Sequence, residues 1–413
     1  MRRNDARNPA AGSRSVILAV LWLTLLVSYF DRVAIAVALP FLSVDLGLSP
    51  SEMGLVSGAL LLSYTLVQVP AGYLSDRFGQ RRVIAVAILW WTVFSVLTGL
   101  AGSLLVLLAV RFLMGAGEGF HPPPLWRMLS NWFAPGRRSV PLALMLTALT
   151  LGPALAPSIA LPVVSAWGWQ WVFYLTAVPG VVTVVLVVRH LRDSPEHADM
   201  TARTAPPPDT AQRRTWWLPH IWLTFAAFFF FGFVLYGLMS WLPTYLLTYR
   251  GLGLASAGLL STTPYVAGTV GLLVGAAVCE RWFNHVRRRF IAAGYLATAV
   301  CIVATVVAPT ITLAGVFLTL AGLFLYSGLG PFWSVPMDVV APHEVGTWLG
   351  FINMGTQIAG FVGPVVIGRL LQATGSFTPV LLAMIVSMVL AAVCLSLVRA
   401  RPIAPVRRTE VAP

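Results

Sequence analysis

Residues 15–42 read SVILAVLWLTLLVSYFDRVAIAVALPFL. About 20 apolar residues in an α-helix are enough to cross the hydrocarbon core of a bilayer, so this stretch predicts a transmembrane helix. Asp31 and Arg32 stand next to each other in its second half. Because one charged side chain at the bilayer centre costs about 2.5–3.5 kcal/mol on insertion scales, two of them in one span indicate a functional site.

Apolar stretches of similar length recur along the whole chain. Of its 413 residues, 58% are hydrophobic and only 10% are charged, a composition that excludes a soluble protein of this size. We predict an all-α polytopic membrane protein with twelve transmembrane helices in two six-helix bundles. The expected spans lie near residues 15–38, 53–74, 83–101, 104–126, 139–162, 171–190, 219–245, 255–279, 290–308, 311–335, 346–370 and 377–398.

The basic residues are distributed unevenly between the loops. The formal net charge is +13, and the arginines gather in the two terminal tails and in the loops after even-numbered spans. Cytoplasmic loops of membrane proteins carry such an excess, so we expect both termini in the cytoplasm and the chain in the inner membrane. The charge is thereby accounted for without a nucleic-acid partner. The arginines outside this pattern are Arg32, Arg111, Arg250 and Arg369.

The longest polar segment, near residues 189–214, is charged and rich in proline and alanine, as expected of a linker. Six spans precede it and six follow it, which indicates a duplicated bundle. Transporters of this kind bind their substrate near the membrane midplane, between the halves. The predicted parts are a cytoplasmic tail (1–14), an N-terminal bundle (15–190), a cytoplasmic linker (191–216), a C-terminal bundle (217–398) and a second cytoplasmic tail (399–413).

Four ionisable side chains lie well inside apolar spans: Asp31, Arg32, Arg111 and Glu118. Arg111 and Glu118 are two helical turns apart, so they share a helix face at a separation of about 10 Å. Asp31 and Glu118 lie at similar depths, and we expect all four groups to meet in one cavity. Burial raises the pKa of a carboxylic acid and a nearby arginine lowers it, which suits reversible protonation. The guanidinium fork matches a carboxylate. The alternative is that these charges only neutralise each other and hold the two spans together.

Further polar residues within spans are weaker candidates for the cavity. Tyr64, Tyr236, Asn353 and Gln357 could contact a substrate, or could make ordinary interhelical hydrogen bonds. His121 could relay a proton or simply pack. Several tryptophans, Trp333 among them, are expected at the membrane interface or in helix packing.

The segment GYLSDRFGQRR, residues 72–82, resembles the signature loop of the major facilitator superfamily. Gln80 departs from that pattern at a usually basic position. RFLMGAGEGF, residues 111–120, resembles the motif of the superfamily's fourth span. The resemblance implies that Asp76 contacts the second half near the start of span 11 and closes the cytoplasmic side. The residues that this implies as a conformational latch are Gly72, Asp76, Arg77, Gly79 and Arg81; the arginines equally fit a plain topology signal.

Motifs spread over nearly the whole chain resemble the anion:cation symporter family, which includes bacterial sugar-acid transporters. This resemblance implies that Asp31 and Glu118 carry protons, that Arg32 and Arg111 form the cationic side, and that Tyr64 and Asn353 contact substrate. The matching segments are YFDR (29–32), Arg111 with Glu118, GWQWVFYL (168–175), DSPEHA (193–198), WLPTYL (241–246), GPFW (330–333) and GPVVIG (363–368).

Together these features predict a monomeric, proton-coupled symporter that takes up an organic anion, such as a sugar acid or another carboxylate, by alternating access. A proton-coupled drug or metabolite antiporter of the same superfamily is the main alternative. Gly152 and Pro153 in span 5 favour it, but the paired glycines expected after them are missing. The chain shows no catalytic triad, phosphate loop or metal-ligand spacing, so we expect no enzyme activity, cofactor or metal. Sugar acids, aromatic carboxylates and small dicarboxylates all remain open as substrates.

Overall fold

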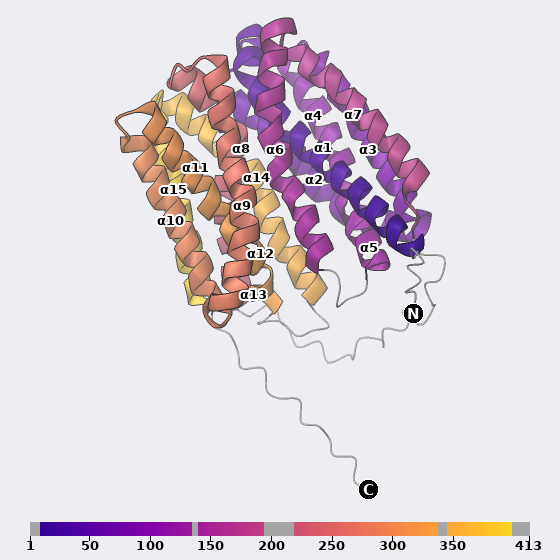
Figure 1. Ribbon diagram of the computed structural model, residues 1–413. Helices are drawn as coiled ribbons and strands as arrows, with labels where there is room; N and C mark the ends of the chain where they lie inside the picture. Colours follow the sequence, from indigo (N-terminus) through magenta and orange to yellow (C-terminus); the bar gives the residue numbers. More distant parts are fainter. Residues whose placement is uncertain (1–8, 134–138, 194–218, 338–344, 399–413) are drawn as a thin grey trace, which may run out of the picture.

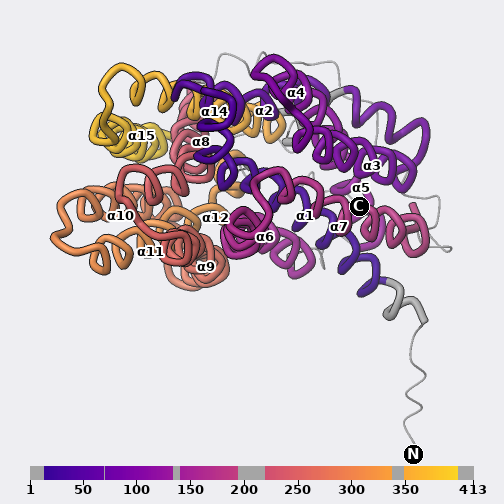
Figure 2. Tube along the Cα trace, turned by 90° about the horizontal axis from the view of Figure 1, so that it is seen from above, coloured from indigo at the N-terminus to yellow at the C-terminus, as the bar shows by residue number. Residues whose placement is uncertain are grey.

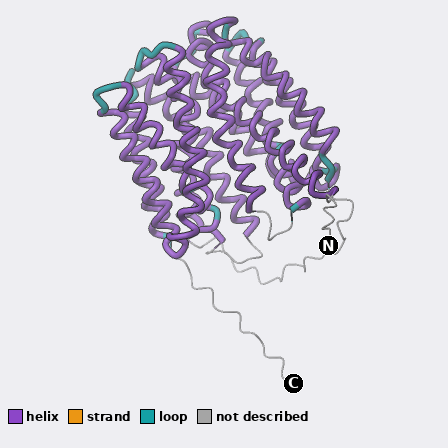
Figure 3. Tube along the Cα trace, in the orientation of Figure 1, coloured by secondary structure: helices purple, strands orange, loops and turns teal. Residues whose placement is uncertain are grey.

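The computed structural model describes residues 9–133, 139–193, 219–337 and 345–398. These residues form helices joined by short loops, with no strand among them (Figure 3). The N-terminal half contains α1 (Pro9–Leu46), α2 (Pro50–Phe78), α3 (Gln80–Gly99), α4 (Leu104–Gly119), α5 (Pro122–Trp132), α6 (Ser139–Trp167) and α7 (Trp169–His190).

The C-terminal half repeats this pattern of long helices interrupted by short ones. Its elements are α8 (Pro219–Thr244), η4 (Tyr245–Tyr249), α9 (Leu254–Val278), η5 (Cys279–Phe283), η6 (Asn284–Val286), α10 (Arg287–Val307), α11 (Ile311–Ser327), α12 (Leu329–Phe332), α13 (Ser334–Met337), α14 (Val345–Thr374) and α15 (Thr378–Leu397).

The twelve predicted spans are all found in this order. In the described part of the chain, ten helical stretches are long and apolar enough to cross a membrane, or eleven if the bent helix α2 counts as one span. One of these stretches, Leu254–Val307, contains both α9 and α10. The prediction of an all-α, twelve-span membrane protein is therefore confirmed. Most of the predicted tails and linker, and the loop arginines Arg137 and Arg138, lie outside the described residues.

Two of the spans are broken where the sequence cannot continue a regular helix. The fourth consists of α4 and α5, which are separated at Phe120 and His121, just before three consecutive prolines. Proline lacks the backbone N–H that an α-helix needs and clashes with the preceding turn. The tenth span is divided into α11, α12 and α13, with Pro331 and Pro336 within the two short pieces. Residues at both breaks lie beside the space between the two halves.

The two halves pack against each other mainly through two pairs of helices, and α1 also contacts α8. Figure 2 looks down on the bundle and shows α9 beside α6 and α14 beside α2, and these pairs are in extensive contact. In the first turns of α2, a Cβ added to Gly54 would lie only 2.4 Å from the carbonyl oxygen of Pro364 on α14. The helices can approach this closely because glycine has no side chain. Between α6 and α9, Thr262 Oγ1 donates a hydrogen bond to the carbonyl oxygen of Ala154 at 3.0 Å.

The contact at Gly54 lies at the end of the molecule opposite the start of α1 and the end of α15 (Figure 1). At the same end, Trp169 Nε1 donates a 2.7 Å hydrogen bond to Asp45 Oδ2 and joins α7 to α1. The outward faces of the helices are apolar; on α3, for example, Val86, Leu89 and Val93 are exposed. Such faces suit contact with lipid chains. The halves therefore meet at this end and along the middle of α6 and α9, and the outer surface of the bundle is apolar.

Candidate functional site

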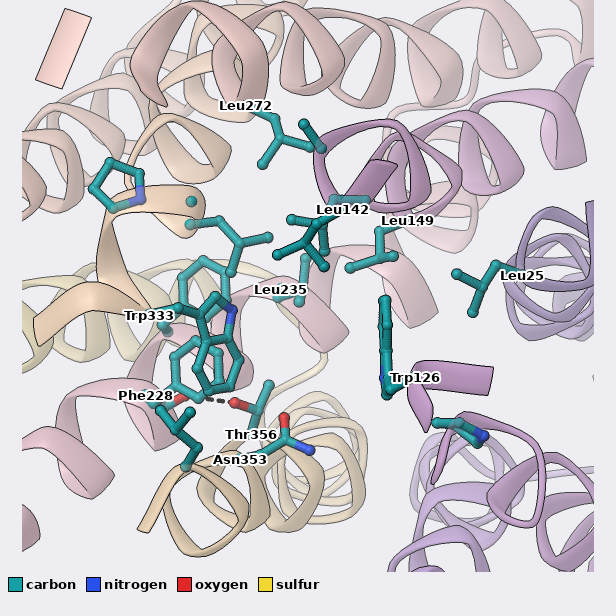
Figure 4. A pocket seen from close by; sticks show the side chains of 18 of the residues that line it. Leu25, Trp126, Leu142, Leu149, Phe228, Leu235, Leu272, Trp333, Asn353 and Thr356 are labelled. Atoms are coloured by element: carbon teal, nitrogen blue, oxygen red, sulfur yellow. Dashed lines mark hydrogen bonds between the residues drawn. The ribbon is translucent and has the colours of Figure 1, made fainter. Parts of the chain in front are cut away.

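A cavity of about 880 Å³ lies between the two halves. Its walls come from helices of both halves: α1, α2, α5 and α6 on one side, and α8, α9, α12 and α14 on the other (Figure 4). At one end it reaches Arg32 on α1. At the other it reaches Glu280 and Asn284, in the turn between α9 and α10, at the same end of the molecule as the chain termini. The cavity therefore extends from mid-bundle toward that end.

Arg32 lines this cavity and is held in place on several sides. Its Nε donates a hydrogen bond to Glu118 Oε2 at 2.7 Å, which forms an ion pair between α1 and α4. Ser28 Oγ donates to the same carboxylate oxygen at 3.2 Å. The Arg32 guanidinium lies 4.7 Å from the ring centre of Tyr29 and 4.6 Å from that of Tyr64. An arginine fixed in this way keeps its fork available for an anion.

Asp31 and Arg111 are buried but do not line the cavity. Asp31 lies within the electrostatic reach of Arg111 and Glu118. Arg111 Nη1 lies 3.3 Å from the sulfur of Met114, and Arg111 Nε and Asp31 Oδ1 have no hydrogen-bond partner among the described residues. Consecutive residues of a helix point about 100° apart, so Asp31 and Arg32 face different surroundings. The four charges thus form one buried group, but only Arg32 reaches the cavity, contrary to the expectation that all four would.

The four weaker candidates, Tyr64, Tyr236, Asn353 and Gln357, all line the cavity. The Tyr236 hydroxyl donates to Gln357 Oε1 at 3.3 Å and connects α8 to α14. The side chain of Asn353 lies beside that of Thr356 at the cavity (Figure 4). Tyr236 and Gln357 therefore make the interhelical hydrogen bond while facing the cavity, and substrate contact by these four residues stays a prediction.

The sequence analysis missed several wall residues. Trp333, expected at the interface or in packing, lines the cavity together with Phe228 and Trp126 (Figure 4). Tyr29, which precedes Arg32 by three positions and shares its helix face, was also missed, and that spacing could have revealed it. His121 lines the cavity at the break between α4 and α5, where its Nε2 lies 2.8 Å from Thr24 Oγ1.

Comparison with known proteins establishes the family. The model of the Major Facilitator Superfamily matches residues 21–364. The chain belongs to this superfamily. It is 32% identical to the probable sulfoacetate transporter SauU of Cupriavidus necator, over 88% of this chain and 89% of that protein. It is 29% identical to the hexuronate transporter of Bacillus subtilis, over 88% and 89% of the two chains.

Other matches agree with this placement. The probable galactarate/D-glucarate transporter GudP of Bacillus subtilis is 26% identical over 91% of this chain and 90% of its own length. A solved bacterial homolog to the human lysosomal transporter Spinster, in an inward-facing and occupied conformation, has a TM-score of 0.75 at 20% identity, covering 93% of this chain and 95% of that one. The first three relatives named here are transporters of organic anions. The chain is therefore a transporter of the superfamily and not an enzyme, and its predicted resemblance to sugar-acid and anion transporters is confirmed.

The superfamily's signature loop joins α2 to α3, and its Gly79 has a clear structural role. Gly79 has a φ of 87°, a backbone conformation that favours glycine. Asp193, just beyond α7, occupies the space beside it: a Cβ on Gly79 would lie 2.5 Å from Asp193 Oδ2. The backbone N–H of Arg81 donates to Asp193 Oδ1 at 2.6 Å, so this carboxylate caps the start of α3.

The other predicted latch residues show no contact with the second half in the described part of the chain. Asp76 forms an ion pair with Arg127 of α5, and both side chains are about half exposed. The guanidinium of Arg77 lies 5.5 Å from the ring centre of Phe78. A Cβ on Gly72 would meet nothing within 4 Å. An exposed ion pair contributes only about 0–1 kcal/mol, so Asp76 is free to exchange partners.

We predict that Gly79→Ala lowers the thermal unfolding temperature of the purified protein. At the φ of 87° and ψ of 148° of Gly79, alanine costs of order 1–3 kcal/mol, and its Cβ would also displace the carboxylate of Asp193. Asp193→Ala should cost about 1 kcal/mol through the lost helix cap. Gly72→Ala, in the same signature segment but within α2 and with open space around it, is the control. Equal unfolding temperatures for the two glycine variants would show that the cap does not matter.

Proposed function

We propose that this protein takes up an organic anion, such as a sugar acid or another carboxylate, by proton-coupled symport with alternating access of its two halves. The observation that carries the proposal is the arrangement of Arg32: one side pairs with buried Glu118 while the residue as a whole lines the cavity. The relatives named above, a probable sulfoacetate transporter, a hexuronate transporter and a probable galactarate/D-glucarate transporter, support an anionic substrate.

The ion pair suggests how proton and anion are coupled. Glu118 and a substrate carboxylate compete for the same guanidinium, because one arginine cannot pair fully with both. When Glu118 is protonated, Arg32 is released to hold the anion in the cavity. When Glu118 loses the proton, the internal pair forms again and the anion leaves. Asp31 and Arg111, packed behind Arg32, would provide a second protonation site and its counter-charge.

Two protonatable acids suit uptake against the membrane potential. Moving one negative charge into a cell interior costs about 2.3 kcal/mol per 100 mV, and more than one accompanying proton reverses that cost. The arginine distribution supports an orientation with both termini in the cytoplasm, and we propose that the chain lies in the inner membrane. In that orientation the cavity opens to the cytoplasm, and the contact at Gly54 closes the outer side. We expect a monomer to carry out the cycle.

Arg32→Ala is expected to weaken anion binding by 10-fold or more while the protein stays folded. A hydrogen bond to a charged group contributes about 1.5–3 kcal/mol, and the variant loses the charge as well. Arg77→Ala, which removes an arginine of the cytoplasmic loop outside the cavity, should bind normally. Calorimetry with an acid first identified by uptake measurements gives the affinities. Near-normal affinity of Arg32→Ala would refute the anion site.

Asp31→Asn is expected to abolish accumulation of substrate driven by a pH gradient but to preserve counterflow exchange. The amide resembles the protonated acid and cannot titrate, while Arg32 remains in the cavity. Glu118→Gln should lose the pH dependence in the same way if both acids share the coupling. Both activities are measured in the same proteoliposomes. Wild-type accumulation with wild-type pH dependence in Asp31→Asn would exclude a proton role for this acid.

Asp76→Asn is expected to leave substrate affinity nearly unchanged and to slow net transport. In this structure Asp76 pairs with Arg127 on its own half, and we propose that it turns to the start of α14 when the cytoplasmic side closes. Cysteine crosslinking between the cytoplasmic ends of the two halves would report the balance of open and closed states. An unchanged balance together with normal transport would leave the loop as a topology signal only.

A further inference from the structure

We infer that the preferred substrate is a monovalent carboxylate with an apolar body that carries few or no hydroxyl groups. This inference rests on the proposed function and narrows it, because sugar acids and dicarboxylates are both less suited to the cavity. Three features of the wall carry the argument: its charges, its apolar surface and the hydrogen bonds already made by its polar groups.

The first feature is the number of charges. Among the described residues that line the cavity, the charged ones are Arg32, Glu280 and Arg287. Glu280 and Arg287 flank the turn between α9 and α10, at the open end, where water reaches them. Arg111, which the sequence suggested as a second anion-binding residue, lies behind the wall. A second carboxylate bound deep in the cavity would therefore lack a counter-charge, and burying an unpaired charge is strongly unfavourable.

The second feature is the apolar surface opposite and around Arg32. Leucine side chains from α1, α6, α8 and α9 point into the cavity, and Phe228, Trp126 and Trp333 add aromatic faces (Figure 4). On α6 alone, Leu142, Leu146 and Leu149 follow one another at helical spacing along the wall. An apolar substrate body gains by leaving water for such a surface, whereas a hydroxylated body gains little.

The third feature is that many polar groups of the wall are already bonded within the protein. Ser28 donates to Glu118, and Tyr236 donates to Gln357. Thr356 Oγ1 donates to the carbonyl oxygen of Phe228 at 3.4 Å. His121 pairs with Thr24. A sugar acid must exchange the hydrogen bonds of each hydroxyl with water for bonds to the protein, and a polar group that fails to do so is costly to bury.

The side chains that remain to receive hydroxyl groups are scattered over the wall. Asn284 and Ser334 lie on the short elements η6 and α13, and the hydroxyls of Tyr29 and Tyr64 belong to the rings that face Arg32. Elsewhere on the wall Gln68 and Asn353 make no hydrogen bond through their side chains among the described residues. They belong to different halves, on α2 and α14, and Asn353 has apolar Phe228 and Trp333 for neighbours in the same view (Figure 4). Two amides and two tyrosine hydroxyls, spread over α1, α2 and α14, can orient a few polar substituents. They cannot replace water around a chain that carries a hydroxyl on nearly every carbon.

The test uses four six-carbon acids that vary charge and hydroxylation independently: hexanoate, gluconate, adipate and glucarate. Affinities are measured by calorimetry on the purified full-length protein. The same titration of the Arg32→Ala variant measures binding that does not depend on Arg32, such as uptake into detergent, and is subtracted. We expect hexanoate to bind at least 10-fold more tightly than each of the other three. Tighter Arg32-dependent binding of gluconate, adipate or glucarate would overturn this inference but leave anion transport intact. Failure of all four to bind in an Arg32-dependent way would overturn both.

A wall variant tests the apolar surface directly. Leu149→Gln places an amide on the α6 wall and should change the gluconate-to-hexanoate affinity ratio by about 10-fold in favour of gluconate. Leu149→Met conserves volume and apolarity and should leave the ratio unchanged. Thermal unfolding of both variants shows whether they are equally well folded. If the glutamine variant is folded and its ratio equals that of the methionine variant, the wall does not select the substrate and the inference is wrong.

Discussion

The buried ion pair between Arg32 and Glu118 is the interaction on which the rest of the site depends. Both side chains are withdrawn from water inside an apolar bundle, where removal of one partner of a buried pair costs about 3–5 kcal/mol. The pair holds α1 against α4, and stacking by Tyr29 and Tyr64 fixes the direction of the guanidinium. In the proposed mechanism an anion that binds Arg32 competes with Glu118, and this competition would link substrate binding to protonation.

The contacts between the two halves are of a kind that can separate, as the proposed alternating access requires. The halves touch through α2 with α14 and through α6 with α9, and at Gly54 the backbones come close because no side chain intervenes. Contacts of this kind can separate without unfolding either half. The breaks at the prolines after His121 and around Pro331 place short, irregular segments beside the cavity, where backbone groups can face water or substrate.

Members of one superfamily share a scaffold and differ in the few side chains that face the substrate. In this chain the segment that resembles the superfamily's signature holds Gly79 against Asp193, and the charged residues of α1 and α4 form a buried group. Leucines of α6 and α9 line the cavity together with Trp333 (Figure 4). In the inference drawn above, selectivity depends on these wall residues, which carry no recognisable motif.

The sequence by itself determined the number of spans, their order, the predicted orientation and the identity of the intramembrane charges. These features depend on the hydropathy of consecutive residues and on which loops carry arginine, and both are properties of the linear sequence. Only the tertiary structure decided which charges face each other and which face the cavity. Asp31 and Arg32 are neighbours in sequence, yet Arg32 pairs with Glu118, and Arg111 lies behind the wall. These helices are apolar on nearly every face, so their rotation about their own axes is set by packing against other helices and not by a periodic pattern.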